Sequence, residues 1–224
     1  MASDTPIKLT DLKLIGIAGK AGSGKTTVAQ FLARSCQQVY IENFADPLKD
    51  ACVAAFHIDR AYFDDPAVKN EPNEYWGVSP RKIAQYAGTE LFRTYMANLL
   101  GAEVANNFWV RSLEGRLTGQ LDAPVGEGYY KPGNTVLIGD VRFQNEYDWI
   151  VAHGGNVINV HRSGLNEVGI VAHPSEAGFN WWSPENNWNL VNESTLEDLY
   201  AQVTELARYL DLTLQDSPSD PFPL

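Results

Sequence analysis

The fold is decided by the stretch Ile15-Gly-Ile-Ala-Gly-Lys-Ala-Gly-Ser-Gly-Lys-Thr-Thr27. Within it, Gly19 to Thr26 fits the pattern G-x-x-x-x-G-K-[ST] of a phosphate-binding loop, or P-loop. Backbone N–H groups of such a loop, together with the positive end of the following helix dipole, bind phosphate. The pattern assigns Lys25 to the β- and γ-phosphates of a nucleoside triphosphate and Thr26 to Mg²⁺. The predicted triphosphate contacts are Gly19, Ala21, Gly22, Ser23, Gly24, Lys25, Thr26 and Thr27.

The residues on both sides of the loop favour a strand before it and a helix after it. Residues 12–18 are apolar enough for a buried strand, and residues 27–33 carry apolar side chains at helical spacing. The alternative is a glycine-rich turn with an incidental lysine, and the flanking pattern disfavours it.

The composition restricts the partners and the compartment. The chain has 224 residues, a net charge of −11 and a sequence pI of about 4.7, so we expect no stable nucleic-acid binding and no membrane partner. Any anionic ligand must then be bound by local clusters of positive side chains. Cys36 and Cys52 form no metal-binding pattern, residues 1–10 lack a secretion signal, and no apolar run reaches membrane-spanning length. We therefore expect a soluble, cytoplasmic protein.

The next segment predicts a short strand followed by a helix. Residues 38–44 form the strand, and Asp46, as N-cap, and Pro47 then begin a helix that runs to about His57. Lys49 lies in the first turn of this helix, near the strand end where open α/β sheets bind ligands. Position alone fits a solvated helix lysine equally well.

Residues 59–78 are acidic, aromatic and rich in proline, which is typical of a long loop or cap. Ser79 and Pro80 then open a long helix. Gly88 in this helix indicates that something packs or binds closely there. Arg93 is a candidate binding residue, and a surface ion pair with a nearby glutamate is its alternative. The residues spaced to form the apolar face of the helix are Ile83, Ala87, Leu91 and Tyr95.

A second buried parallel strand is predicted at residues 135–140, where an apolar run ends in Asp140. An aspartate at the exit of such a strand in a P-loop protein is a candidate for binding Mg²⁺ directly or through water. The alternative is a helix N-cap.

The remaining elements follow the same logic. Arg162 follows a strand, and residues 163–187, with Trp181 and Trp182, suit a lid. Ser194 is expected to cap a C-terminal helix, and residues 215–224 form an expected disordered tail. Further helices are expected at 103–117, 147–153 and 194–212, strands at 156–161 and 188–193, and a surface loop at 119–133. The inward-facing residues of the last helix should be Leu196, Leu199, Val203 and Leu206.

Alternating strands and helices predict an α/β fold with three layers. We expect a mostly parallel five-stranded sheet with helices on both faces, in a single domain that spans residues 1–214. A helical region at residues 59–100 and the lid are additions to this core. All candidate site residues fall at strand exits or on the helices that follow them, so they should converge on one edge.

A P-loop indicates nucleotide binding, but a kinase, a switch or motor NTPase and a polynucleotide-modifying enzyme all contain one. A kinase needs positive groups around the transferring phosphoryl group. A GTPase would ordinarily carry an N-K-x-D-like motif, which this sequence lacks. The cations suitably distributed for a kinase are Lys49, Arg81, Arg93, Arg142 and Arg162.

Over residues 12–210, the chain resembles bacteriophage-type deoxynucleoside monophosphate kinases. The resemblance rests on five short sequence segments, or phrases, that occur in the same order. The phrases are Gly19 to Thr26, Phe44 to Lys49, Ser79-Pro80-Arg81 with Gln85 and Gly88 to Arg93, Asp140 to Glu146, and His173 to Glu176.

The resemblance implies the P-loop kinase fold and transfer of the γ-phosphoryl group of ATP to a deoxynucleoside monophosphate (dNMP). Thr26 and Asp140 would then organise Mg²⁺, and no strong general base is required because the acceptor phosphate is already anionic. Gln85 would lie nearer the base or sugar, and Trp76 is a candidate for base stacking, with ordinary packing as its alternative. The implied catalytic residues are Lys25, Lys49, Arg142 and Arg162. The implied acceptor-binding residues are Asp46, Lys49, Trp76, Arg81, Gln85, Thr89, Arg93 and Glu176. Glu176 lies in the expected lid, where His173 is a second candidate.

Two other functions stay open at this point. One is a P-loop kinase of another phosphorylated metabolite such as phosphomevalonate, and the other is a DNA-modifying kinase or ATPase, which the acidic composition disfavours. The preferred base, the choice between ATP and dATP, and the oligomeric state, including a homodimer, are left open as well. If the protein is phage-encoded, the expected compartment is the host cytoplasm.

Overall fold

A five-stranded parallel sheet forms the centre of the protein in the computed structural model, which describes residues 7–121, 130–164, 179–180 and 183–215. The order is β2-β3-β1-β4-β5, and all pairs between these strands are parallel, as predicted. The strands are β1 (Lys13–Ala18), β2 (Val39–Glu42), β3 (Thr135–Val141), β4 (Asn156–His161) and β5 (Asn187–Val191).

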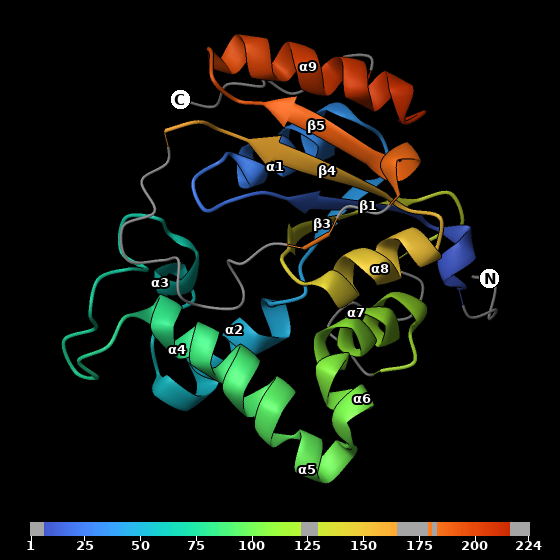
Figure 1. Ribbon diagram of the computed structural model, residues 1–224. Coiled ribbons are helices and arrows are strands. Elements are labelled where there is room, and N and C mark those ends of the chain that lie inside the picture. The colour runs from blue at the N-terminus through green and yellow to red at the C-terminus, as the bar shows by residue number, and fades with distance from the viewer. Residues whose placement is uncertain (1–6, 122–129, 165–178, 181–182, 216–224) are drawn as a thin grey trace, which may run out of the picture.

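Helices cover both faces of the sheet and make three layers (Figure 1). On one face, α1 (Lys25–Ser35) and α9 (Leu196–Tyr209) pack against Ile15, Leu137 and Ile158. On the other face, α2 (Asp46–Phe56), α7 (Phe108–Thr118) and α8 (Gln144–Ala152) pack against Leu14, Val136 and Val157. Because neighbouring residues of one strand belong to opposite cores, the central strands β1 and β3 carry runs of consecutive buried apolar residues, at positions 14–18 and 136–138.

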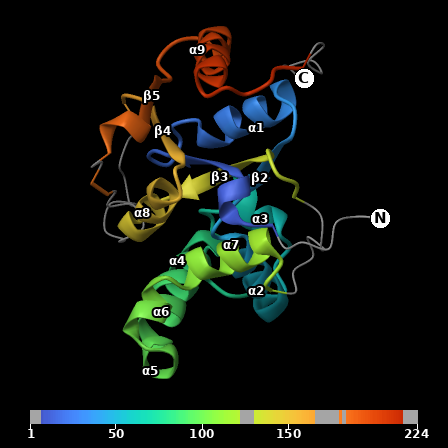
Figure 2. The same cartoon turned by 90° about the vertical axis from the view of Figure 1, so that its right-hand side faces the viewer.

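A helical arm extends from the second of these faces and lies far from α9 (Figure 2). It contains α3 (Ala61–Asp64), α4 (Pro80–Tyr86), the π-helix η2 (Ala87–Tyr95), α5 (Ala97–Leu100) and α6 (Ala102–Asn106). The Ser79 hydroxyl caps α4, as predicted, by accepting a hydrogen bond from the Lys82 backbone at 3.4 Å. The expected loop at residues 59–78 contains α3, and the expected helix at 103–117 is divided into α6 and α7 at Asn107.

The π-helix explains where the predicted apolar face of this region fails. Leu91 and Tyr95 are exposed, because the wider turn of a π-helix rotates side chains out of the 3.6-residue period. The close approach predicted at Gly88 is confirmed. A Cβ atom at Gly88 would lie 2.7 Å from Cδ2 of Leu48, and the indole of Trp109 donates to the Gly88 carbonyl at 3.0 Å.

Two predicted helix caps are wrong by one residue. Asp46 is the first residue of α2, not its N-cap, and its carboxylate accepts from Asn43 and Arg60 instead. The N-cap of α9 is Thr195, not Ser194, because the Thr195 hydroxyl accepts from the Asp198 backbone at 3.2 Å. Starting the helix there leaves Leu196 half exposed, contrary to the predicted inward face.

After α9 the C-terminal segment returns to the end of α1. The Gln215 backbone donates to the Ser35 carbonyl at 2.8 Å, and the rest of the expected tail, residues 216–224, lies outside the described residues. Among the described helices, none is long and apolar enough to cross a bilayer.

Two leucines of α9 test the orientation of this helix. Leu199 is 1% exposed, so Leu199→Ala should lower the free energy of unfolding by about 2–5 kcal/mol. Leu196 is 51% exposed, so Leu196→Ala should change it by less than about 0.5 kcal/mol. Urea unfolding measures both values, and equal losses would contradict the packing of α9.

Candidate active site

The loop after β1 has the conformation that a phosphate cradle requires. Gly19, Gly22 and Gly24 have backbone φ angles of 142°, 79° and 105°, which residues other than glycine rarely adopt. A Cβ atom at Gly19 would also lie 2.4 Å from the Val160 carbonyl of β4. The loop leads directly into α1 at Lys25, so the unpaired N–H groups of the first helical turn face the same end.

The side chains of the loop are disposed as the motif predicts. The Lys25 ammonium group donates to the carbonyls of Gly19 at 2.6 Å and Lys20 at 2.8 Å, and therefore lies over the loop. Thr26 is exposed in the first turn of α1. Ser23 is buried, and its hydroxyl oxygen has no hydrogen-bond partner among the described residues. A buried hydroxyl group without a partner fits a loop that receives further acceptors from a ligand.

Asn192, which the sequence did not single out, supports the loop from β5. Its side-chain amide donates to the Ser23 carbonyl at 2.8 Å, and its backbone donates to the His161 carbonyl at 2.8 Å. Asn192 follows β5 directly, so its place at a strand exit was the one signal that could have identified it.

Asp140 joins the exit of β3 to the start of α2. Its two carboxylate oxygens accept hydrogen bonds from the backbone of Phe44 at 2.8 Å and of Ala45 at 2.9 Å. Burial raises the pKa of Asp140, although these two hydrogen bonds and the charge of Arg142 act in the opposite direction. The alternative that Asp140 caps a helix is wrong, because α8 begins at Gln144.

The strand register places the next residues beside the P-loop. Val141 of β3 pairs with Ala18 of β1. The next residues of the two strands, Arg142 and Gly19, therefore lie beside each other. The carboxyl ends of β1 and β3 therefore bring the triphosphate loop and the Asp140–Arg142 segment to one edge of the sheet, as predicted.

An ion-pair network connects α2 with α3. The Lys49 ammonium group lies 2.6 Å from one carboxylate oxygen of Asp64, and Nε of Arg60 lies 2.9 Å from the other. Arg60 also pairs with Asp46 at 2.6 Å and with Asp50. Burial alone would raise the pKa of Asp64, but Lys49 and Arg60 lower it overall. Asp46 and Lys49 are thus held at the start of α2 by groups of the helical arm.

Three of the predicted cations affect the pKa of one further lysine, Lys69. Burial lowers the pKa of Lys69, and the positive charges of Arg81, Arg142 and Lys49 lower it further, against the charge of Asp64. Lys49 of α2, Arg81 of α4 and Arg142 after β3 therefore all affect the charge of Lys69, while Lys49 is itself paired with Asp64. Lys69 escaped prediction because its segment reads as an unpatterned loop.

Arg93 forms the ion pair with a glutamate that was its alternative, but this pair is buried rather than at the surface, and the acceptor contact of Arg93 stays a prediction. Its guanidinium group is 2.6 Å from Glu146, and the two side chains are 8% and 3% exposed. It also contacts Asn145 at 3.2 Å and lies 3.9 Å from the ring centroid of Phe143. Burial lowers the pKa of Arg93.

Glu146 completes the connection to Arg142. Its second carboxylate oxygen accepts from the backbone of Arg142 at 2.8 Å and of Phe143 at 3.0 Å. Burial raises the pKa of Glu146 to about 7, although Arg93 and these two backbone groups favour the carboxylate. Arg93 in η2 therefore fixes the Arg142 backbone through Glu146, and this pair joins the helical arm to the sheet.

A second buried ion pair holds the turn before α2. Arg116 of α7 lies 2.6 Å from Glu42 and donates to the Asn43 carbonyl at 3.0 Å. The hydroxyl group of Tyr130 donates to the other oxygen of Glu42. The backbone that carries the Phe44 and Ala45 amide groups is thus fixed from both sides.

The remaining predicted residues divide into three groups. Gln85 and Thr89 are half-buried, on α4 and η2, and Arg162 is exposed directly after β4. Trp76 lies apart from the other predicted acceptor residues, because its indole donates to the Phe56 carbonyl at 2.9 Å, at the far end of α2 from Asp46. His173, Glu176 and most of the expected lid fall outside the described residues.

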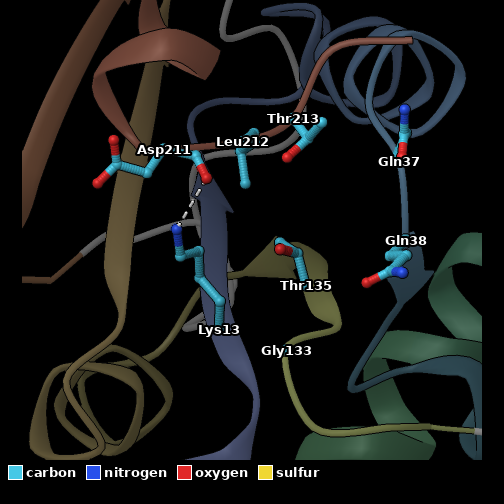
Figure 3. Close-up of a pocket in the computed structure, with 8 residues that line it drawn as sticks. All are labelled: Lys13, Gln37, Gln38, Gly133, Thr135, Asp211, Leu212 and Thr213. Carbon is cyan, nitrogen blue, oxygen red and sulfur yellow. Dashed lines mark hydrogen bonds between the residues drawn. The ribbon is translucent and has the colours of Figure 1, made fainter.

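A small cavity of about 140 Å³ lies at the opposite edge of the sheet, where the strands begin (Figure 3). The Lys13 ammonium group there donates to the carbonyls of Leu210 at 2.7 Å and Asp211 at 3.2 Å, and so satisfies the C-terminal end of α9. The lining residues are Lys13, Gln37, Gln38, Gly133, Thr135, Asp211, Leu212 and Thr213. This cavity is remote from the P-loop and contains none of the predicted site residues.

A double-mutant cycle tests the buried pair of Arg93 and Glu146. Removing one partner leaves the other buried without its counter-charge, so Arg93→Met or Glu146→Gln alone should cost about 3–5 kcal/mol. The double variant should lose clearly less than the sum of the two, by more than about 0.5 kcal/mol in urea unfolding. Strictly additive losses would show that the two side chains do not interact.

The chain matches no family model. It is 36% identical over 199 residues to a protein of Acanthamoeba polyphaga mimivirus, and the match covers 85% of this chain and 93% of that protein. The viral protein carries the name deoxynucleotide monophosphate kinase as a provisional assignment. Identity at this level over most of both chains confirms the resemblance that the five sequence phrases indicate. The chain belongs to the deoxynucleotide monophosphate kinase family.

Proposed function

We propose that this protein transfers the γ-phosphoryl group of ATP to the phosphate of a dNMP and so produces ADP and a deoxynucleoside diphosphate. The observation that carries the proposal is the strand register, which places Arg142 beside the P-loop. Lys49 and Arg81, on the neighbouring helices α2 and α4, act together with Arg142 on the charge of Lys69. These observations support a triphosphate site and an acceptor-phosphate site at the same edge of the sheet.

The reaction requires little covalent participation by the protein. An oxygen of the acceptor phosphate forms a bond to the γ-phosphorus, and the bond between that phosphorus and the β–γ bridging oxygen breaks. ADP leaves with the electron pair. The acceptor phosphate is already anionic near neutral pH, so the side chains have to position the reactants and stabilise charge rather than remove a proton.

On the donor side, the loop amides and the ammonium group of Lys25 bind the β- and γ-phosphates. The carbonyls of Gly19 and Lys20 hold Lys25 over the loop until the triphosphate replaces them. Asn192 keeps the loop in place from β5.

The residues at the site fit Mg²⁺, which prefers oxygen ligands and keeps several waters. The exposed hydroxyl group of Thr26 is suited to bind it. Asp140 is suited to bind it through water, because each of its oxygens already accepts a backbone hydrogen bond. When bound, Mg²⁺ would neutralise the negative charge that develops on the transferring phosphoryl group.

On the acceptor side, Lys49 and Arg81 bind the acceptor phosphate, and Arg142 lies between the two phosphates. Arg162, directly after β4, stabilises charge on the transferring phosphoryl group, and Glu176, outside the described residues, stays a candidate contact to the acceptor. Arg93 acts through the Arg142 backbone, because its guanidinium group is buried against Glu146. Gln85 and Thr89 lie on the same helical region and bind the deoxynucleoside.

The proposal is tested by incubating the protein with ATP, Mg²⁺ and each dNMP in turn, base-modified ones included. We expect a diphosphate product with at least one dNMP. Turnover with phosphomevalonate alone would favour the metabolite kinase, and salt-sensitive DNA binding with ATP hydrolysis would favour the DNA-modifying enzyme. Either result, or no turnover with any dNMP, would overturn the proposal.

Lys25→Ala should reduce turnover by about 10²-fold or more, because it removes a cation from the transferring phosphoryl group. Lys131→Ala is the matched control, since Lys131 is exposed before β3 at the opposite edge of the sheet. Thermal unfolding shows whether both variants are folded. Equal activities of the two variants would exclude Lys25 from the reaction.

A further inference from the structure

We propose that Lys69 is an additional cation of the acceptor site and binds the phosphate of the dNMP together with Lys49, Arg81 and Arg142. The inference rests on the proposed function and deepens it, because it identifies a substrate-binding residue that the sequence phrases do not include. Lys69 lies between α3 and α4, in a segment without recognisable pattern.

The backbone of Lys69 is fixed on both sides. Its N–H group donates to the Asp65 carbonyl at 3.0 Å, just after α3, and its carbonyl accepts from the Arg81 N–H group at 3.0 Å, in the first turn of α4. The residue is half-buried. Its position relative to Arg81 is therefore set by the fold rather than by a flexible loop.

The charged groups with the largest effect on the pKa of Lys69 are three cations and one carboxylate. Arg81, Arg142 and Lys49 act on it from three different elements, and Asp64 is the carboxylate that acts in the opposite direction. Both oxygens of Asp64 already accept from other cations, Lys49 at 2.6 Å and Arg60 at 2.9 Å. The pKa of Lys69 is lowered, by burial first and by the three cations second.

Binding of an anion would offset the repulsion between Lys69 and the neighbouring cations. Partial burial of a lysine among cations costs free energy, because the charged form loses solvation and is repelled by its neighbours. A phosphate group placed among these side chains would attract all of them at once. The same cations neighbour the P-loop through Arg142, so the anion that fits is the acceptor phosphate of the reaction.

The experiment compares the binding of a dNMP with that of the corresponding deoxynucleoside, which lacks the phosphate, by calorimetry without ATP. Lys69→Met should weaken dNMP binding by about 10- to 100-fold, since it removes a charged hydrogen bond to phosphate. Binding of the deoxynucleoside should stay the same. In turnover assays, KM for the dNMP should rise and KM for ATP should not change.

Three further variants make the test decisive. Lys69→Arg keeps the charge and should retain most of the affinity, and Lys69→Gln should repeat the loss if Lys69→Met does not fold. Lys82→Met is the matched control, because Lys82 is exposed on the neighbouring helix α4. Unchanged dNMP binding by both uncharged variants, or equal losses for dNMP and deoxynucleoside, would overturn the inference. Absence of dNMP turnover in the wild-type protein would overturn the proposed function instead.

Discussion

The two hydrogen bonds that Asp140 accepts from the Phe44 and Ala45 amides hold the halves of the site together. Asp140 is the last residue but one of β3, which lies beside β1, and Ala45 immediately precedes α2. This contact helps to fix the start of α2 relative to the P-loop. Because the carboxylate is buried and accepts two backbone donors, it defines the geometry of the edge where both substrates would meet.

Buried ion pairs extend this constraint into the helical arm. Arg93 and Glu146 join η2 to the Arg142 backbone, and Arg116 and Glu42 hold the turn before Phe44. Such pairs add little net stability, since the loss of hydration offsets most of the attraction. We interpret these ion pairs as a means of holding the site in a defined geometry, because catalysis by charge stabilisation requires cations in defined places.

The sequence predicted the sheet well because its strands are unambiguous. The strand at residues 156–161 has the predicted bounds, and the P-loop glycines have the required φ angles. Prediction from the sequence failed where contacts in the folded protein determine the local structure. The π-helix turns Leu91 outward, and the burial of Arg93 depends on Glu146, which is distant in the chain. Lys69 carries no motif, and only the folded arrangement brings it among three other cations.

We propose that the P-loop and the region of Lys49, Lys69, Arg81 and Arg142 form one site for two substrates. The most direct measurement is steady-state inhibition by a single molecule that joins adenosine to a deoxynucleoside through a chain of phosphates. If the two regions are adjacent, this molecule should compete with both ATP and the dNMP and should bind more tightly than either. Competition with ATP alone would contradict the claim, because the second region would then not receive the acceptor.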